Sequence, residues 1–123
     1  GFRIWEQPIS SNLTPIAVDE YLFLTSKDNI FYILDHLSGD IIWYKDLKQI
    51  IPKDEEIKFI GQLMVKGMIY LFTKDGDLLI IDLKDSISFS YEPDLISDLS
   101  ISPIIVNQRL YIVTENGLLI SYK

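Results

Sequence analysis

The sequence has no cysteine, one histidine and one alanine in 123 residues. Without cysteine, disulfide frameworks, zinc fingers and cysteine nucleophiles are excluded. Alanine is the best helix former, and its near absence beside 21 isoleucines and 16 leucines favours strands. Positive charge is also scarce, because 11 basic residues face 18 acidic ones for a net charge of −7, which argues against nucleic acid and anionic membrane as partners. No apolar run is long enough to span a bilayer.

What the chain does contain is an internal repeat. Residues 15–35 align with residues 62–82 after a shift of 47 positions, and residues 102–123 align after a further shift of about 41. The first shift places identical residues on one another at 18/65, 24/71, 27/74, 28/75 and 35/82. With 48% hydrophobic residues, the chain has enough apolar side chain for a folded core, so three copies of one small folding unit are predicted.

Each copy shows short apolar runs bounded by glycine, asparagine and aspartate, which is the pattern of strands rather than helices. In the first copy, strands are predicted over residues 16–18, 21–25, 30–34 and 41–44. Lys66-Gly67, Asp75-Gly76 and Asn116-Gly117 supply the tight turns in the later copies. Four antiparallel strands per repeat of about 40–50 residues predict an all-β fold of β-propeller blades, about three blades' worth, as part of a larger propeller.

The turn between the third and fourth predicted strands carries a motif. Residues 33–43 read ILDHLSGDIIW, in which Asp35 can accept hydrogen bonds from turn amides and Gly39 tolerates a left-handed backbone. Ser38 is a turn residue, and Trp43 offers a large flat face to a neighbouring blade. The pattern resembles the tryptophan-docking blade of the pyrroloquinoline-quinone-like β-propellers. Trp5 stands four residues after Gly1, as Trp43 stands four after Gly39, so residues 1–8 are predicted to be the outer strand of a preceding blade.

The later copies keep only part of this motif. Asp82 occupies the position of Asp35, but the serine, glycine and tryptophan that should follow are missing. The chain is therefore predicted to be one propeller segment, residues 1–123. It consists of an outer strand (1–8), two blades (13–45 and 57–92) and an incomplete blade (102–123). The two long loops between blades, residues 45–56 and 91–101, are suited to partner contacts.

Three blades are fewer than the about four to eight of a closed ring. Two assemblies are therefore open at the level of sequence. The chain is part of a longer propeller, or two copies form a homodimer in which the first strand of each completes the last blade of the other.

Residues suited to chemistry are few. His36 lies within the turn motif at a position that accepts any residue, so we expect a solvated turn residue rather than a member of a catalytic triad. The acidic run at residues 74–77 suggests a calcium loop, but position 12 counted from Asp75 is Ser86 and position 5 is Leu79, which rejects it. The sequence thus predicts no catalytic, cofactor-binding or metal-binding residues, and the six residues singled out as a structural blade motif are Asp35, Ser38, Gly39, Trp43, Trp5 and Asp82.

The family resemblance implies a function that the residues alone do not. It is closest in type to the BamB outer-membrane assembly lipoproteins, which implies a non-catalytic scaffold with protein partners in the assembly machinery. Such a protein is periplasmic or associated with the outer membrane, with any lipid anchor lying outside this segment. The same blade type implies, as alternatives, a fragment of a pyrroloquinoline-quinone-dependent dehydrogenase or an extracytoplasmic sensor, and fold alone does not choose among them.

Overall fold

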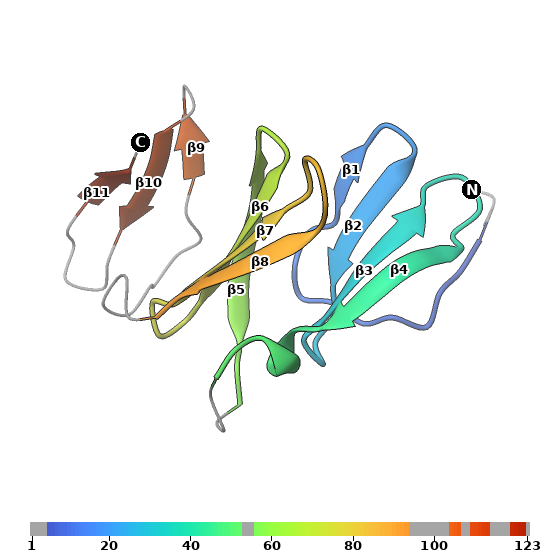
Figure 1. Ribbon diagram of the computed structural model, residues 1–123, viewed down its shortest axis with the longest axis horizontal. Helices are drawn as coiled ribbons and strands as arrows, with labels where there is room; N and C mark the ends of the chain where they lie inside the picture. Colours follow the sequence, from blue (N-terminus) through green and yellow to red (C-terminus); the bar gives the residue numbers. More distant parts are fainter. Residues whose placement is uncertain (1–4, 53–55, 94–103, 107–108, 114–118, 123) are drawn as a thin grey trace. The chain divides into compact units, whose positions relative to one another are not determined.

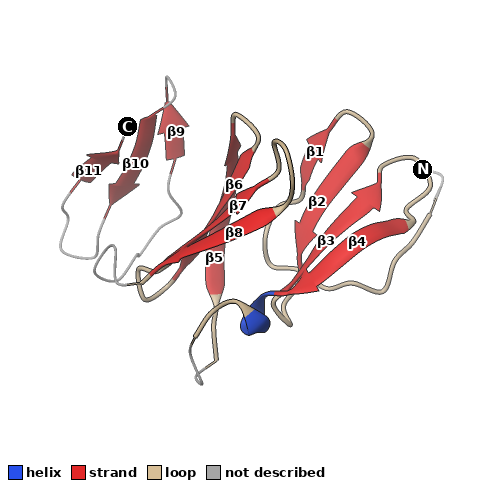
Figure 2. Ribbon diagram, in the orientation of Figure 1, coloured by secondary structure: helices blue, strands red, loops and turns tan. Residues whose placement is uncertain are grey.

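The structure is a computed structural model that describes residues 5–52, 56–93, 104–106, 109–113 and 119–122. The described residues form three antiparallel sheets and one short 3₁₀ helix (Figures 1 and 2), which confirms the all-β, blade-type fold predicted from the repeat. The chain divides into two compact units, Gly1–Glu56 and Ile57–Lys123.

The first unit contains a four-stranded meander. Its strands are β1 (Ile16–Val18), β2 (Tyr21–Thr25), β3 (Ile30–Asp35) and β4 (Ile41–Asp46), hydrogen-bonded in that order. All four begin at the predicted residues, and β3 and β4 end one and two residues later than predicted. A bulge between Ile33 and Leu34 interrupts the pairing of β3 with β4, at the end of the sheet that leads into the motif turn.

A 3₁₀ helix, η1 (Leu47–Gln49), follows β4. The carboxylate of Asp46 accepts a hydrogen bond from the amide of Lys48 and so caps the helix. Leu47 and Ile51 are 0% and 2% exposed. The stretch predicted as a long loop over residues 45–56 is therefore anchored by two buried apolar side chains. Its residues 53–55, and the second predicted loop from residue 94 onward, lie outside the described residues.

The second unit repeats the meander. Its strands are β5 (Phe59–Val65), β6 (Met68–Thr73), β7 (Leu78–Asp82) and β8 (Ser88–Glu92), again paired in chain order. The turn between β5 and β6 has φ of 51° at Lys66 and 79° at Gly67, as expected for a tight hairpin. The fourth strand forms although the motif residues that precede it in the first copy are absent.

A third, three-stranded meander follows. It consists of β9 (Ile104–Val106), β10 (Arg109–Val113) and β11 (Leu119–Tyr122) in the order β11-β10-β9. The predicted Asn116-Gly117 turn lies outside the described residues.

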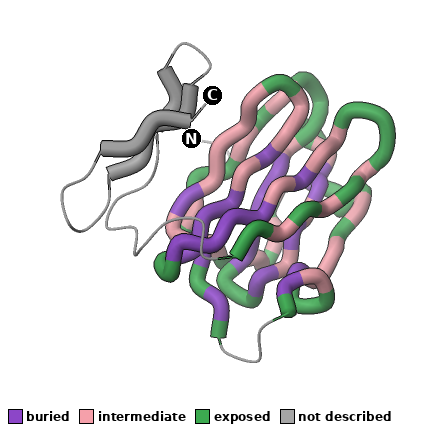
Figure 3. The backbone as a smooth tube through the Cα atoms, turned by 60° about the vertical axis from the view of Figure 1, so that its left-hand side comes forward, coloured by how far each residue is buried: buried purple, intermediate pink, exposed green. Residues whose placement is uncertain are grey.

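Several strands are buried on both faces, because β2 and β6 each end in three consecutive buried residues (Figure 3). The core side chains of the first unit include Phe31, Leu34 and Leu47, all at most 1% exposed. Those of the second unit include Ile69, Leu71 and Ile81, all 0% exposed. The central strands of both meanders thus carry the core.

The segment before β1 does not form a strand where it is described. Residues 5–8 were predicted as part of an outer strand, but they have no strand assignment, and residues 1–4 lie outside the described residues. The outer-strand assignment of residues 1–8 and the division of the chain into blades stay predictions.

Candidate functional site

The turn between β3 and β4 is built around the carboxylate of Asp35. One carboxylate oxygen, Oδ1, accepts hydrogen bonds from the amides of Leu37 at 2.9 Å and Ser38 at 3.0 Å. The amides of Ser38 and then Leu37 favour the charged form and lower the pKa of Asp35. The backbone closes the same turn, since the amide of Gly39 donates to the carbonyl of Asp35 at 2.9 Å. The turn therefore has a fixed shape.

Trp5 lies directly on this turn. Its indole Nε1 donates to the carbonyl oxygen of His36 at 3.1 Å, and the side-chain amide of Gln7 donates to the carbonyl of Gly39 at 2.7 Å. Gly39 has φ of 79° and is buried. A Cβ atom built on Gly39 would lie 2.5 Å from Cε3 and 2.8 Å from Cγ of Trp5, so a side chain there collides with the ring. The indole thus fits against the backbone of the turn.

The segment that begins at Trp5, residues 5–15, crosses one face of the first sheet. At its far end, the carbonyl of Ser10 accepts a hydrogen bond from the amide of Lys27 at 2.8 Å, and the hydroxyl of Ser11 donates to the carbonyl of Thr25. Its odd-numbered residues from 5 to 13 are half-buried, whereas the even-numbered ones are exposed. We call residues 5–15 the strap.

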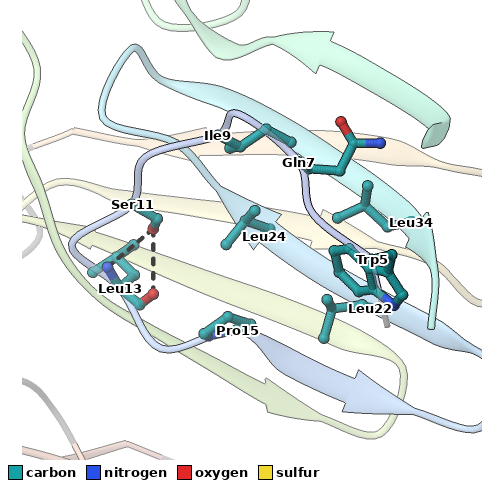
Figure 4. A pocket seen from close by; sticks show the side chains of 9 residues that line it. All are labelled: Trp5, Gln7, Ile9, Ser11, Leu13, Pro15, Leu22, Leu24 and Leu34. Atoms are coloured by element: carbon teal, nitrogen blue, oxygen red, sulfur yellow. Dashed lines mark hydrogen bonds between the residues drawn. The ribbon is translucent and has the colours of Figure 1, made fainter. Parts of the chain in front are cut away.

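An open cavity of about 290 Å³ lies between the strap and the sheet. Figure 4 shows strap side chains and three leucines of β2 and β3 directed into it. None of its lining residues is charged; they are Trp5, Gln7, Ile9, Ser11, Leu13, Pro15, Leu22, Leu24 and Leu34. The cavity can hold apolar groups and offers no nucleophile–base pair for catalysis.

The equivalent turn of the second unit keeps the carboxylate contact. Oδ1 of Asp82 accepts from the amide of Lys84 at 3.0 Å. The amide of Leu83 donates to the carbonyl of Gly67 at 2.9 Å, which parallels the bond from His36 to Glu20 at 2.8 Å in the first unit. The retained aspartate therefore shapes the same kind of turn without the rest of the motif.

A buried aspartate directly before β7 is paired with a half-buried tyrosine. Asp77 is 1% exposed, and its Oδ2 accepts a hydrogen bond of 2.6 Å from the hydroxyl of Tyr91 on β8. The amide of Asp77 donates to the hydroxyl oxygen of Thr73 at 2.9 Å. Asp77, which belongs to the acidic run rejected as a calcium loop, is therefore buried and links the start of β7 to β8.

The structure brings four of the six motif residues together, namely Trp5, Asp35, Ser38 and Gly39. Trp43 lies on β4, half-buried and edge-on to Phe31 with a ring separation of 6.5 Å. Asp82 belongs to the other unit. The role of the six residues as a blade motif stays a prediction.

Sequence reasoning missed two features of these sites. Gln7 carries no pattern that would have marked it. Asp77 could have been noticed, because the 47-residue shift places an aspartate where the first copy has Ile30, the first residue of an apolar run. His36 is exposed at the turn, as expected.

In the part of the chain that the structure describes, no three or more His, Asp or Glu side chains gather in a group that could hold a metal ion. No helix within that part is long and apolar enough to cross a membrane.

Comparisons with known proteins identify the type of fold. No protein-family model matches the chain. The chain is 24% identical over 132 aligned residues to the outer membrane protein assembly factor BamB of Moranella endobia strain PCIT, covering 97% of this chain and 32% of that protein. The chain thus spans about a third of the length of the curated relative that it matches.

Two solved structures share the fold. The crystal structure of BamB from Moraxella catarrhalis matches with a TM-score of 0.70 at 16% identity, over 94% of this chain and 33% of that one. The quinohemoprotein alcohol dehydrogenase ADHIIG from Pseudomonas putida HK5 matches with a TM-score of 0.64 at 23% identity, over 97% of this chain and 20% of that one.

The two four-stranded sheets therefore match part of a β-propeller of the pyrroloquinoline-quinone-like type. The chain is a distant relative of BamB, and it shares its fold with the quinohemoprotein alcohol dehydrogenases as well. The resemblance inferred from the turn motif is confirmed.

Proposed function

We propose that the chain is a non-catalytic propeller scaffold that binds proteins and serves in outer-membrane protein assembly, as a BamB-like factor. The observation that carries this proposal is the match to the assembly factor of Moranella endobia, which extends over 97% of the chain. The protein is then periplasmic or associated with the outer membrane.

The geometry of the first unit suits such a role. The strap, the capped turn and the docked indole hold a rigid surface without a reactive group among the residues lining the cavity. Rigid blades present loops and sheet edges to a protein partner at little entropic cost. We place the partner among the proteins of the outer-membrane assembly machinery.

The scaffold proposal is tested in the source organism. Deleting the gene should lower the amounts of several outer-membrane β-barrel proteins in the outer-membrane fraction, while inner-membrane proteins serve as the internal control. Complementation with the wild-type gene should restore them. Unchanged outer-membrane protein levels in the deletion strain would contradict the proposal.

The fold match to ADHIIG favours one second candidate, a segment of a quinoprotein dehydrogenase. The dehydrogenase candidate is distinguished from the scaffold by adding pyrroloquinoline quinone and calcium to the native protein and measuring dye-linked alcohol oxidation. The scaffold proposal predicts no quinone-dependent oxidation above that of a heat-denatured sample. Saturable oxidation would favour the dehydrogenase.

A further inference from the structure

The strand β4 lies at one edge of the first sheet. Within the described residues it pairs with β3 alone, since the order of strands is β1-β2-β3-β4 (Figure 1). An edge strand leaves every second amide and carbonyl without a partner strand, and native sheets protect such edges by charge, by proline or by a very short strand. The opposite edge is protected in this way, because β1 has three residues and directly follows Pro15.

A hydrogen bond just beyond β4 shows which of its backbone groups face outward. The amide of Leu47 donates to the carbonyl of Asn29 at 2.9 Å, so these two residues form a hydrogen-bonded pair that continues the β3–β4 ladder. Such pairs alternate along antiparallel strands, so the amide and carbonyl of Lys45 also bond to β3. The amide and carbonyl groups of Tyr44 and Asp46 therefore point away from β3.

The side chains along this edge favour pairing with a further strand. Residues 41–44 read IIWY, four residues of high β propensity in succession. Ile41, Ile42 and Tyr44 are 43%, 52% and 64% exposed, and large apolar side chains gathered on a surface mark interaction sites. The 47-residue shift places the edge strand β8 on β4, and there the exposed positions carry two serines and a glutamate. The outer strand of the first sheet is thus apolar where its counterpart is polar.

The two faces of β4 indicate which sequence pattern complements it. Tyr44 and Ile41 lie on one face of the sheet, because their register partners on β3 are two positions apart. Lys45 lies on the other face. A strand added at this edge meets apolar neighbours on the first face and a charged neighbour on the second. Its complement is an extended segment in which apolar residues alternate with polar ones, and the net charge of −7 favours a segment without excess negative charge.

We infer that the outer edge of β4, residues 41–46, binds an extended segment of another protein by strand addition. Backbone hydrogen bonds to Tyr44 and Asp46 hold the segment, and its apolar side chains pack on those of Ile41 and Tyr44. Alternation of apolar and polar residues over about ten positions is the pattern of outer-membrane β-barrel strands. The inference names the kind of segment that the proposed scaffold binds, and it rests on that proposal for the source of the segment.

The test is amide hydrogen exchange of the full-length protein, measured by NMR with and without a synthetic peptide of about ten residues in which valine alternates with threonine and lysine. Without peptide, the amide of Tyr44 should exchange fast and that of Lys45 slowly. Saturating peptide should slow exchange at Tyr44 by about tenfold or more, because a hydrogen bond to the peptide replaces one to water. A control peptide with its two central valines replaced by proline should leave exchange at Tyr44 unchanged.

Tyr44→Pro separates the edge from the rest of the fold. Proline removes the outward amide and no hydrogen bond to β3, so the variant should keep the circular dichroism of the wild type. It should lose binding of the fluorescently labelled peptide, measured by anisotropy. The matched control is Tyr44→Thr, which keeps the amide and a high β propensity and should still bind.

Three results would overturn the inference. Slow exchange at Tyr44 without peptide would mean that this edge is already covered in the full-length protein. The other two are an exchange rate at Tyr44 that the peptide does not change, and equal peptide binding by Tyr44→Pro and the wild type. The gene-deletion test fails separately, because peptide binding with unchanged outer-membrane proteins leaves a strand-binding edge without a role in assembly.

Discussion

At the scale of single residues, the contact between Trp5 and Gly39 explains why this turn needs a glycine. Two separate demands coincide, since Gly39 has positive φ and the indole occupies the space of a Cβ. The hydrogen bond from the indole to His36 then fixes the ring in place. The tryptophan and the glycine are 34 residues apart in sequence, so their contact helps hold the strap on the sheet.

The two demands can be separated by comparing two glycines. Gly39→Ala should destabilise the fold by about 1–3 kcal/mol through backbone strain, with a further loss because Trp5 must move. Gly67 has the same φ of 79°, but a Cβ there meets the flexible side chain of Lys84 at 2.7 Å. Gly67→Ala should cost the same strain and a smaller further loss, because Cγ of Lys84 must shift but no ring has to move.

Urea unfolding of both variants measures these losses, and the emission of Trp5 in a Trp43→Phe background reports whether the indole moves. The expected result is a larger loss and a shifted emission for Gly39→Ala only. Equal losses at the two glycines, with unchanged emission, would mean that the ring does not rest on the turn.

At the scale of elements, the strands were the most predictable feature. The apolar runs and turn residues of the first copy located the starts of β1 to β4 correctly, because each strand begins directly after a turn residue or a polar pair. The ends were less certain. β4 runs on to Asp46, which pairs with Ile30 on β3 and also caps η1. A single-turn 3₁₀ helix has too few residues to show a periodicity.

The candidate site was predictable only in part. The residues of the β3–β4 turn form a local pattern, so Asp35, Ser38 and Gly39 could be recognised from their spacing. The strap could not, because its contacts join residues such as Gln7 and Gly39 that are 32 positions apart. Long-range contacts made by single polar side chains leave no periodic trace in one sequence.

The bond between Asp77 and Tyr91 ties β8 to the start of β7. Tyr91→Phe removes the 2.6 Å hydrogen bond to a carboxyl group that is 1% exposed, and should cost about 1–3 kcal/mol in the free energy of unfolding. The matched control is Tyr44→Phe, which removes the hydroxyl of a side chain that is 64% exposed and should change stability little. Chemical denaturation of the three proteins makes the comparison. Equal stability of the two variants would show that the Asp77–Tyr91 bond contributes nothing to the sheet.

At the scale of the whole molecule, the excess of acidic residues opposes compaction. The 18 acidic and 11 basic side chains leave each chain at −7, and like charges repel in the folded state more than in the expanded one. Screening of these surface charges by salt should therefore favour folding.

The thermal midpoint should therefore rise with salt. Raising sodium chloride from about 0.01 M to about 0.15 M shortens the Debye length from about 30 Å to about 8 Å, and should stabilise the fold by an amount on the order of 1 kcal/mol, or several degrees in Tm. The control is the double variant Glu56→Gln, Asp85→Asn, which neutralises two exposed carboxylates and changes the net charge from −7 to −5. Its Tm should be higher at low salt and rise less. A Tm that falls with salt in the wild-type chain would show that attraction between opposite charges outweighs the repulsion between like charges.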